Sequence, residues 1–345
     1  MTPMPTDPRL LIVLLNWRTA PMTLRAAAEG LAAMAELRRI MPTARCEMVI
    51  VDNASGDGSY EMLSEAATGR GWTKDGTVRV IQSGHNGGFG AGNNVGIRAG
   101  MSDGTPPDLV YLLNSDAFPE PDALLALIRA LAADPGAGIA GSFIFGEDST
   151  PHETAFRFPS FLSEFETSAC TGPISRLLSR FRVPLDIPQH TTRVDWLAGA
   201  SMMIRREVLE QIGLFDETFF LYFEETDLCL RAERAGFATL YVPESRVMHI
   251  GSVSTGMKTW VELPDYWYDS RLHYFTKNHG KLYAGLCSLA QILGAGVQLL
   301  RRPAKRRARP GQLGRLLGHH RRTLASGTPN RGETPMPLRD MKGKS

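Results

Sequence analysis

Four apolar runs of strand length constrain the fold of this chain more than any other feature. The runs are RLLIVLL (9–15), CEMVIVD (46–52), TVRVIQS (77–83) and DLVYLLN (108–114), and segments with helical periodicity lie between them. Continuous apolar strands separated by helices are typical of a parallel sheet covered on both faces. The sequence therefore predicts an α/β fold, Rossmann-like, with a mostly parallel sheet flanked by helices and a helical extension at the C-terminal end.

The cysteines and the N-terminal segment indicate a reducing, intracellular setting. Cys46, Cys170, Cys229 and Cys287 lie far apart and form no CxxC pair, so neither a zinc site nor a disulfide framework is indicated. The segment MTPMPTDPR has no apolar run before the first predicted strand and does not resemble a signal peptide. We expect the body of the protein to be cytoplasmic.

Polar or glycine residues follow each of the predicted strands. In an open parallel sheet, ligands bind at the carboxyl ends of the strands. Asn, Asp and Gly are also common in turns for conformational reasons alone, so each loop singly could be structural. The agreement of four consecutive strand ends favours a binding site, whose candidates are Asn16 and Trp17, Asp52 and Asn53, the loop GHNGGFGAGNN (84–94), and Asn114, Ser115 and Asp116.

The glycine-rich loop does not fit a dinucleotide-binding dehydrogenase. That fingerprint, G-x-G-x-x-G, follows the first strand and opens a helix. Here the glycines follow the third strand, and Asn93 stands where the last glycine would be. We expect the glycines to let the backbone approach a diphosphate or a sugar near a helix N-terminus, with Asn86, Gly88 and Asn93 as contacts.

Six ordered motifs resemble the family 2 glycosyltransferases with the GT-A fold, particularly their rhamnosyltransferase-like branch. They are LLIVLLNW, VDNASGDGS, NGGFGAGNNVGI, LLNSDA, DWLAGASMMIRREVLEQIGLFDETFFLYFEETDLCLRAERAG and VPESRVMHIGSVST. The resemblance implies a GT-A domain over 1–280. Residues 9–116 would form its nucleotide-binding half and residues 117–280 its acceptor and catalytic half. Residues 145–192 have weak periodicity, and we expect a loop region there.

The resemblance implies roles for the first strand ends. Asp52 matches the acid that hydrogen-bonds the nucleobase, with Asn53 beside it, and Asn16 and Trp17 match the strand end that lies along the nucleoside. Asn93 stands where many relatives carry a basic residue, so its contact with the donor departs from the family pattern.

The resemblance also implies a metal site. Asn114, Ser115 and Asp116 match the family's D-x-D motif, with Asp116 as the direct ligand of Mn²⁺ or Mg²⁺. Asn114 would be a weaker ligand or a contact to the donor, and Ser115 a contact to the donor. His249 matches the position of a further ligand, and an imidazole would favour Mn²⁺. The alternative for His249 is a buried, hydrogen-bonded histidine. A cation would neutralise charge on the departing nucleoside diphosphate.

The segment YFEETDLCLR supplies the candidate base. Inversion at the anomeric carbon requires a carboxylate to take the proton of the attacking hydroxyl. By resemblance this is Glu225, with Glu224 as a possible substitute, while Asp227 and Arg231 are expected to form an i,i+4 pair. The alternative is a charged but structural helix N-terminus, where acids are favoured in any case.

The segment LAGASMM is expected to lie beneath the acceptor. Trp196 could offer an apolar face to a sugar ring, and Gly199 and Ala200 would permit close approach. Ordinary core packing is the alternative for these residues.

Together these features predict an inverting, metal-dependent glycosyltransferase. It would transfer a sugar, with dTDP-rhamnose favoured as donor, to a saccharide or lipid-linked saccharide acceptor in cell-surface polysaccharide synthesis. The alternatives are a non-catalytic nucleotide-sugar-binding protein and a two-carboxylate glycoside hydrolase.

The charge of the chain divides into two parts. Residues 301–345 hold 13 Lys and Arg against 2 acids, whereas the remainder holds 25 against 34. The basic part lacks aromatic residues and a recognisable nucleic-acid module, so we expect it to contact anionic lipid and no nucleic acid. The predicted location is therefore peripheral, on the inner face of the plasma membrane, with 310–345 as a basic, disordered tail.

Residues 281–309 are predicted to form an apolar, amphipathic helix. The stretch 282–300 carries no charge. Three placements are open: a helix lying in the membrane interface, a helix packed on the body of the protein, and a transmembrane span. The interfacial placement is favoured because polar residues recur along one stripe, at Lys281, Ser288, Gln291, Gln298 and Lys305.

Overall fold

The computed structural model describes residue 5, residues 7–251 and residues 263–301, with positions 314, 317, 318 and 321 beyond them. Apart from those isolated positions, the predicted tail 310–345 lies outside the described residues. The strands are β1 (Arg9–Asn16), β2 (Arg45–Asp52), β3 (Val78–Gln82), β4 (Leu109–Asn114), β5 (Ala117–Pro119), β6 (Ala137–Phe145), β7 (Ala155–Phe156), β8 (Thr192–Val194), β9 (Trp196–Leu197), β10 (Ser201–Arg205) and β11 (Ala238–His249).

Helices alternate with these strands, as the sequence predicts. They are α1 (Ala20–Ile40), α2 (Ser59–Gly69), α3 (Gly88–Ala99), α4 (Ala123–Ala133), α5 (Phe161–Ala169), α6 (Gly172–Leu177), the 3₁₀ turn η1 (Ser179–Phe181), α7 (Arg206–Ile212), α8 (Glu224–Arg234), α9 (Asp265–His279) and α10 (Lys281–Arg301).

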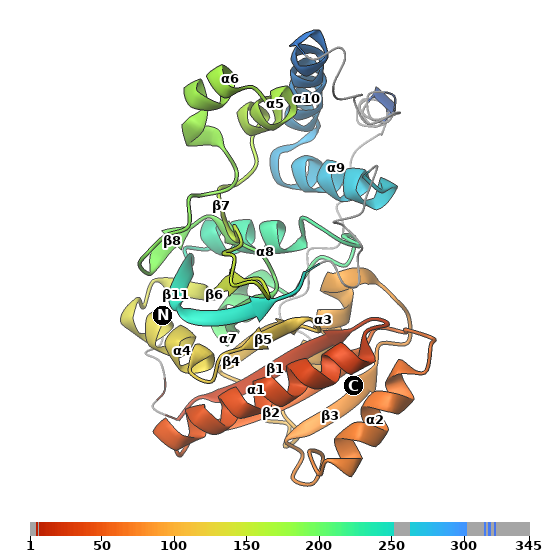
Figure 1. The fold of residues 1–345 in the computed structure, drawn as a ribbon, viewed down its shortest axis with the longest axis vertical. Coiled ribbons are helices and arrows are strands. Elements are labelled where there is room, and N and C mark those ends of the chain that lie inside the picture. Colours follow the sequence, from red (N-terminus) through yellow and green to blue (C-terminus); the bar gives the residue numbers. More distant parts are fainter. Residues whose placement is uncertain are drawn as a thin grey trace.

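One large sheet organises the chain in the order β3-β2-β1-β4-β10-β6-β11-β5, with β8 paired to β11 (Figure 1). The first four strands of this order run parallel. β10 is antiparallel to both of its neighbours, and β6 and β11 are again parallel. The predicted α/β fold class is therefore confirmed.

The two faces of the sheet carry separate apolar cores, because successive side chains of a strand point to opposite faces. Leu10, Ile12 and Leu14 of β1 pack in the core that includes α1 and α4. Leu11 and Val13 pack in the core that includes α3, α7 and α8. The near-continuous apolar character of the predicted strands follows from this burial on both sides.

The region 145–192 is not the loop region that the sequence predicts. It holds β7, α5, α6 and η1. α5 begins at a capping box in which the Ser160 hydroxyl accepts from the Ser163 backbone N–H. The helix is only nine residues long and packs along α10, so most of its stabilisation is tertiary and its periodicity in the sequence is weak.

α10 covers residues 281–301 of the predicted apolar helix 281–309, and residues 302–309 lie outside the described residues. Ser288 and Gln291 are buried, and the Ser168 hydroxyl of α5 donates to the Gln291 carbonyl at 2.7 Å. This side of α10 is therefore packed on the protein. Of the described residues, only the stretch from Lys281 to Leu300 is long and apolar enough to cross a membrane, and 39% of it is buried in the protein.

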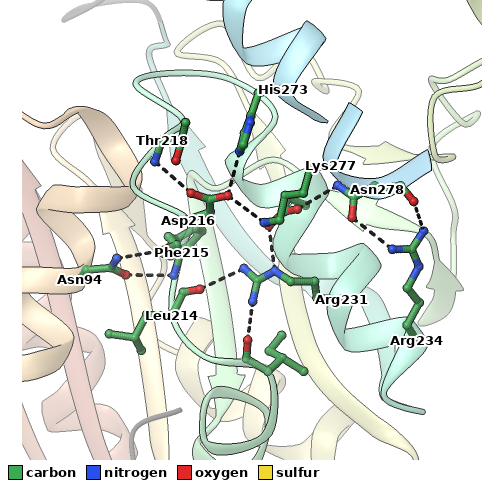
Figure 2. A network of polar contacts seen from close by, with 12 residues as sticks. Asn94, Leu214, Phe215, Asp216, Thr218, Arg231, Arg234, His273, Lys277 and Asn278 are labelled. Atoms are coloured by element: carbon green, nitrogen blue, oxygen red, sulfur yellow. Dashed lines mark hydrogen bonds and ion pairs between the residues drawn. The ribbon is translucent and has the colours of Figure 1, made fainter. Parts of the chain in front are cut away.

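A buried polar network joins α9 to α8 and to the segment before α8 (Figure 2). Lys277 of α9 donates to Asp216 and to Asp227, both at 2.8 Å. His273 lies 2.9 Å from Asp216, and Arg231 pairs with Asp227 at 2.8 Å, as the i,i+4 spacing predicts. This network anchors both ends of the segment that leads into α8.

The network explains how two carboxylates remain charged out of water. Burial alone would raise the pKa of Asp216, but hydrogen bonds from His273 and Lys277 outweigh burial and hold that pKa well below its usual range. Burial likewise opposes ionisation of Asp227, and Arg231 and Lys277 outweigh it. Lys277 thus stabilises two buried anions at once.

Replacing Lys277 with Met should therefore destabilise the protein. Removing one partner of a buried pair leaves an uncompensated charge and typically costs about 3 to 5 kcal/mol. Lys74→Met, at an exposed lysine, is the matched control. Chemical denaturation of both variants gives the comparison, and a loss at Lys277 no larger than that at Lys74 would contradict the role of the network.

Candidate active site

Parallel pairing brings the predicted strand ends together. Asn16 is in register with Asp52 across β1 and β2, and Leu15 is in register with Asn114 across β1 and β4. A cavity of about 270 Å³ opens at this edge of the sheet. It is lined by Leu15, Trp17, Asn53, Asn86, Gly88, Phe89, Asn114, Ser115, Asp116, Phe220, Leu221 and Tyr266.

Asn16 and Asp52 lie behind the cavity wall rather than in its lining. Both are buried, and the Asn16 amide donates to the Asp52 carboxylate at 2.7 Å. Ser55 donates to the same carboxylate through its hydroxyl, at 2.5 Å, and through its backbone N–H, at 3.2 Å. Thr23 donates to the Asn16 amide oxygen at 2.7 Å. These bonds fix the Asp52 carboxylate, and its contact with a nucleobase stays a prediction.

Asn53 and Asn86 order the cavity wall at the start of α3. The Asn53 amide donates to the Asn86 side chain at 3.0 Å and to the Gly88 carbonyl at 3.1 Å. The Asn86 oxygen also accepts the Gly88 N–H at 3.0 Å. The buried Asn53 Oδ1 has no hydrogen-bond partner among the described residues. A buried acceptor left in this state is satisfied by a bound donor group or water.

The glycines of α3 serve close packing within the protein. Gly88 has φ of +89°, and a Cβ there would lie 1.7 Å from the Phe220 carbonyl oxygen. The Phe89 N–H donates to that oxygen at 3.0 Å. A Cβ on Gly92 or Gly96 would meet side chains of β1. Gly88 does line the cavity, but its conformation and this contact already require glycine.

Asn93 faces the helix rather than the cavity. It is buried, and its amide donates to the Phe89 carbonyl at 3.0 Å. Asn94, which the sequence analysis did not single out, exchanges hydrogen bonds with the Phe215 backbone at 2.9 and 3.0 Å. Asn94 therefore holds the segment before α8 against α3, and Asn93 as a donor contact stays a prediction.

Asp116 and His249 meet at the other side of the cavity. His249 Nε2 lies 3.0 Å from Asp116 Oδ1, although the two residues are 133 positions apart. Antiparallel pairing of β5 with β11 places Ala117 opposite His249 and so creates the contact. The Thr19 hydroxyl donates a hydrogen bond to the Ser115 hydroxyl oxygen at 3.0 Å, which fixes the turn after β4.

This pair has the chemistry of a partial cation site. Among the described residues, no group of three or more His, Cys, Asp or Glu side chains is arranged to hold a metal. A carboxylate and an imidazole suit a divalent cation that completes its shell with phosphate oxygens and water. The residues present therefore fit a cation that binds together with a phosphate-bearing ligand, and their role as ligands stays a prediction.

Two adjacent glutamates begin α8 and have different surroundings. Glu224 is buried, and its Oε2 has no partner among the described residues. Burial raises the pKa of Glu224 well above its usual range, and the charge of Glu225 adds to the shift. Burial also raises the pKa of Glu225, but this side chain is partly exposed and accepts the Gly199 N–H at 3.1 Å. Of the two carboxyls, Glu224 is therefore the one whose pKa is raised further.

Strained backbone presents this pair. Tyr222 and Phe223 have φ of +71° and +69°, a region that side-chain-bearing residues rarely adopt. Such conformations cost about 1 to 3 kcal/mol each and persist where the surroundings enforce them. α9 supplies those surroundings, because Phe223 packs on Trp267 and Tyr274 and Tyr222 stacks with Tyr266.

Gly199 and Ala200 connect the glutamates with the end of β4. Gly199 N–H donates to Glu225, and the Ala200 carbonyl accepts the Asn114 N–H at 3.1 Å. A Cβ on Gly199 would lie 2.6 Å from Glu225 Oε1 and 2.9 Å from the Phe89 ring. Only glycine permits the carboxylate and the cavity-lining ring to approach this backbone together.

Trp196 packs within the protein on at least one face. Its ring stacks on Phe156 with centroids 4.2 Å apart, and its indole N–H donates to the Arg157 carbonyl at 2.9 Å. It does not line the cavity. Contacts of Trp196, Gly199 and Ala200 with an acceptor stay predictions.

Several residues of the site were not predicted from the sequence. Phe220, Leu221 and Tyr266 line the cavity, and Lys277 and His273 support it from α9. Phe220 and Leu221 lie in an aromatic run beside the recognised acids, which could have drawn attention to them. Tyr266, Lys277 and His273 belong to a helix whose only relation to the cavity is tertiary.

Sequence comparisons place the chain in a family. The family described as "Glycosyltransferase like family 2" matches residues 31–263. The chain is 29% identical over 290 residues to the N-acetylglucosaminyl-diphospho-decaprenol L-rhamnosyltransferase of Mycobacterium tuberculosis, covering 79% of this chain and 89% of that protein. It is 30% identical over 164 residues to the rhamnosyltransferase WbbL of Escherichia coli, covering 47% of this chain and 60% of that protein.

Solved structures share the fold. The mannosyltransferase PcManGT from Pyrobaculum calidifontis, solved with GDP-Man and Mn²⁺, matches with a TM-score of 0.54 at 15% identity, covering 94% of this chain and 89% of that one. TarS 1-349 from S. aureus matches with a TM-score of 0.51 at 12% identity, covering 92% and 81%. The fold is GT-A, and the chain belongs to glycosyltransferase family 2, as a sugar-transferring enzyme with relatives named rhamnosyltransferases.

Proposed function

We propose that this enzyme is an inverting, metal-dependent glycosyltransferase that transfers rhamnose from dTDP-rhamnose to a lipid-linked saccharide in cell-surface polysaccharide synthesis. The names of the relatives support the sugar and the acceptor class. The single observation that carries the reaction type is the bridge formed by Gly199 and Ala200. This dipeptide is hydrogen-bonded to Glu225 on one side and to Asn114, at the Asp116 end of the cavity, on the other.

The donor would bind along the strand ends. Trp17, Asn53, Asn86 and Ser115 line a cavity large enough for part of a nucleotide sugar. Asn114 would contact the diphosphate. Asp116 and His249 would hold Mn²⁺ or Mg²⁺, which would neutralise charge on the departing nucleoside diphosphate. Mn²⁺ in the solved mannosyltransferase supports a divalent cation.

Glu225 would act as the general base. Its carboxylate, oriented by the Gly199 N–H, would accept the proton of the acceptor hydroxyl while the hydroxyl oxygen forms a bond to the anomeric carbon. The bond from that carbon to the diphosphate oxygen breaks on the opposite face, so configuration inverts. The buried Glu224, in its neutral form, would leave one negative charge in the pair. Membership of a glycosyltransferase family argues against the glycoside hydrolase alternative.

Replacing Glu225 with Gln should lower kcat by about 10² to 10⁴ and leave donor affinity nearly unchanged, as expected for loss of a general base. Glu224→Gln is the matched control, since an amide resembles the protonated acid in shape and charge. Steady-state kinetics and donor titration separate the two effects. Near-normal turnover by the Glu225 variant would remove the base from that residue, and a larger loss in the control would transfer the assignment to Glu224.

Asp116→Ala should abolish the stimulation of donor binding by metal, and chelation with EDTA should abolish activity of the unmodified enzyme. His249→Ala should raise the metal concentration that half-maximal activity requires. Asp122→Ala, at an exposed acid of the next helix, is the control. Donor titrations with and without Mn²⁺ give the measurement. Full activity after exhaustive chelation would refute the metal requirement.

Glu224 should also make stability depend on pH. Because its folded-state pKa is raised, its contribution to stability is complete below the unfolded value of about 4.3 and is lost as pH rises through the folded value. The melting temperature of Glu224→Gln minus that of the unmodified enzyme should therefore increase as pH rises from about 4.5 to 8.5. Parallel melting profiles across this range would show that Glu224 ionises normally.

A further inference from the structure

An exposed leucine row runs along α10, on the side opposite its contact with α5. Successive leucines are spaced by four, three, four and seven residues, which places them on one face of a helix. They are Leu282, Leu286, Leu289, Leu293 and Leu300. Their exposed fractions are 90%, 42%, 45%, 56% and 85%. A row of large apolar side chains facing outward marks a surface that another apolar phase covers.

The packed face of the same helix explains why the leucines point outward. A Cβ on Gly294 would lie 2.6 Å from the Phe165 carbonyl, so α10 and α5 approach closely at this glycine. Ser288 is buried and accepts a hydrogen bond from Arg271 of α9 at 3.3 Å. The inner face is thereby fixed to α5 and α9, and the leucine row cannot turn inward without breaking these contacts.

Exposed basic residues lie at the same end of the molecule as the leucine row. The segment of α6 and η1 exposes Arg176, Arg180 and Arg182 together with Leu177, and it contains no acid between 172 and 182. α6, α5 and α10 lie at the same end of the molecule (Figure 1). The sequence immediately after α10 adds further positive charge, with basic residues at Arg302, Lys305, Arg306, Arg307 and Arg309.

We propose that the leucine row of α10 and the arginines of α6 and η1 form a docking surface for an anionic lipid bilayer. The leucines would enter the headgroup and acyl boundary, and the arginines would contact anionic headgroups. A span is disfavoured because one side of α10 is packed on the protein. Pairing of α10 with the same helix of a second copy of this chain is disfavoured. Helices that pair along an apolar seam usually carry charged residues beside the seam, and 282–300 has none.

This inference deepens the proposed function, since a lipid-linked acceptor resides in a membrane. It assigns the lipid contact to the leucine row of α10 and adds the arginines of α6 and η1 to it. Vesicle binding can be measured without donor or acceptor, so its failure is distinguishable from failure of the proposed reaction.

The test is co-sedimentation of the full chain with phosphatidylcholine vesicles that contain or lack phosphatidylglycerol. The double substitution of Leu286→Gln and Leu289→Gln should lower the partition coefficient on anionic vesicles about tenfold or more. Ile40→Gln with Met62→Gln, at similarly exposed positions on α1 and α2, is the matched control and should bind normally. Circular dichroism and melting temperature establish that each variant is folded.

Replacing Arg176, Arg180 and Arg182 with Gln should weaken binding to anionic vesicles and reduce its dependence on salt. Three outcomes would overturn the proposal: no binding by the unmodified chain at low salt, full binding by the double leucine variant, or light scattering that shows a dimer dissociated by the leucine substitutions. Full binding by the leucine variant would assign lipid contact to the basic sequence after α10.

Discussion

The parallel pairing of β1 with β2 and β4 is the constraint on which the site depends. It aligns the carboxyl ends of the central strands, so Asn16 and Asp52 lie in register and Asn114 stands beside Leu15. Parallel strands require crossover helices, and those helices bury both faces of the sheet. The loops at this edge are therefore supported by two apolar cores, and the cavity is built on a rigid base.

α9 stabilises the segment that carries the two candidate glutamates. Two strained residues, Tyr222 and Phe223, precede a pair of adjacent glutamates, one of them buried. Aromatic packing from α9 holds the strained backbone, and Lys277 neutralises carboxylates on both sides of the segment. α10 follows α9 directly in the chain. The helices that support the acids thus belong to the same end of the molecule as the proposed lipid surface.

The sequence predicts β1 to β4 well, because burial on both faces makes each of these strands a continuous apolar run, whereas β5, β6 and β8 were not predicted. It also predicts the Asp227–Arg231 pair, which depends only on helical spacing. The contact of Asp116 with His249 follows from family resemblance alone, since antiparallel pairing of β5 with β11 has no local signal. Tyr266 and Lys277 were missed for the same reason.

The orientation of α10 could not be predicted from the sequence, for a different reason. Helical periodicity defines two faces but does not say which one the protein covers. Small residues such as Ala284 and Gly294 allow close approach to neighbouring helices, and Ser288 finds hydrogen-bond partners there. Close packing of α10 against its neighbours and the hydrogen bonds of its buried polar groups together outweigh the usual preference for burying large apolar side chains. The glycines of α3 are a parallel case, in which a loop suited to a ligand is shaped mainly by contacts with Phe220 and β1.

In the proposed reaction, Glu225 activates the acceptor hydroxyl for a single displacement at the anomeric carbon. NMR can determine the anomeric configuration of the glycoside formed from dTDP-rhamnose. We expect a configuration that is inverted relative to the donor, and no covalent sugar on the enzyme. Retention of configuration, or a glycosyl adduct on Glu225 or Glu224 detected by mass spectrometry, would contradict this mechanism.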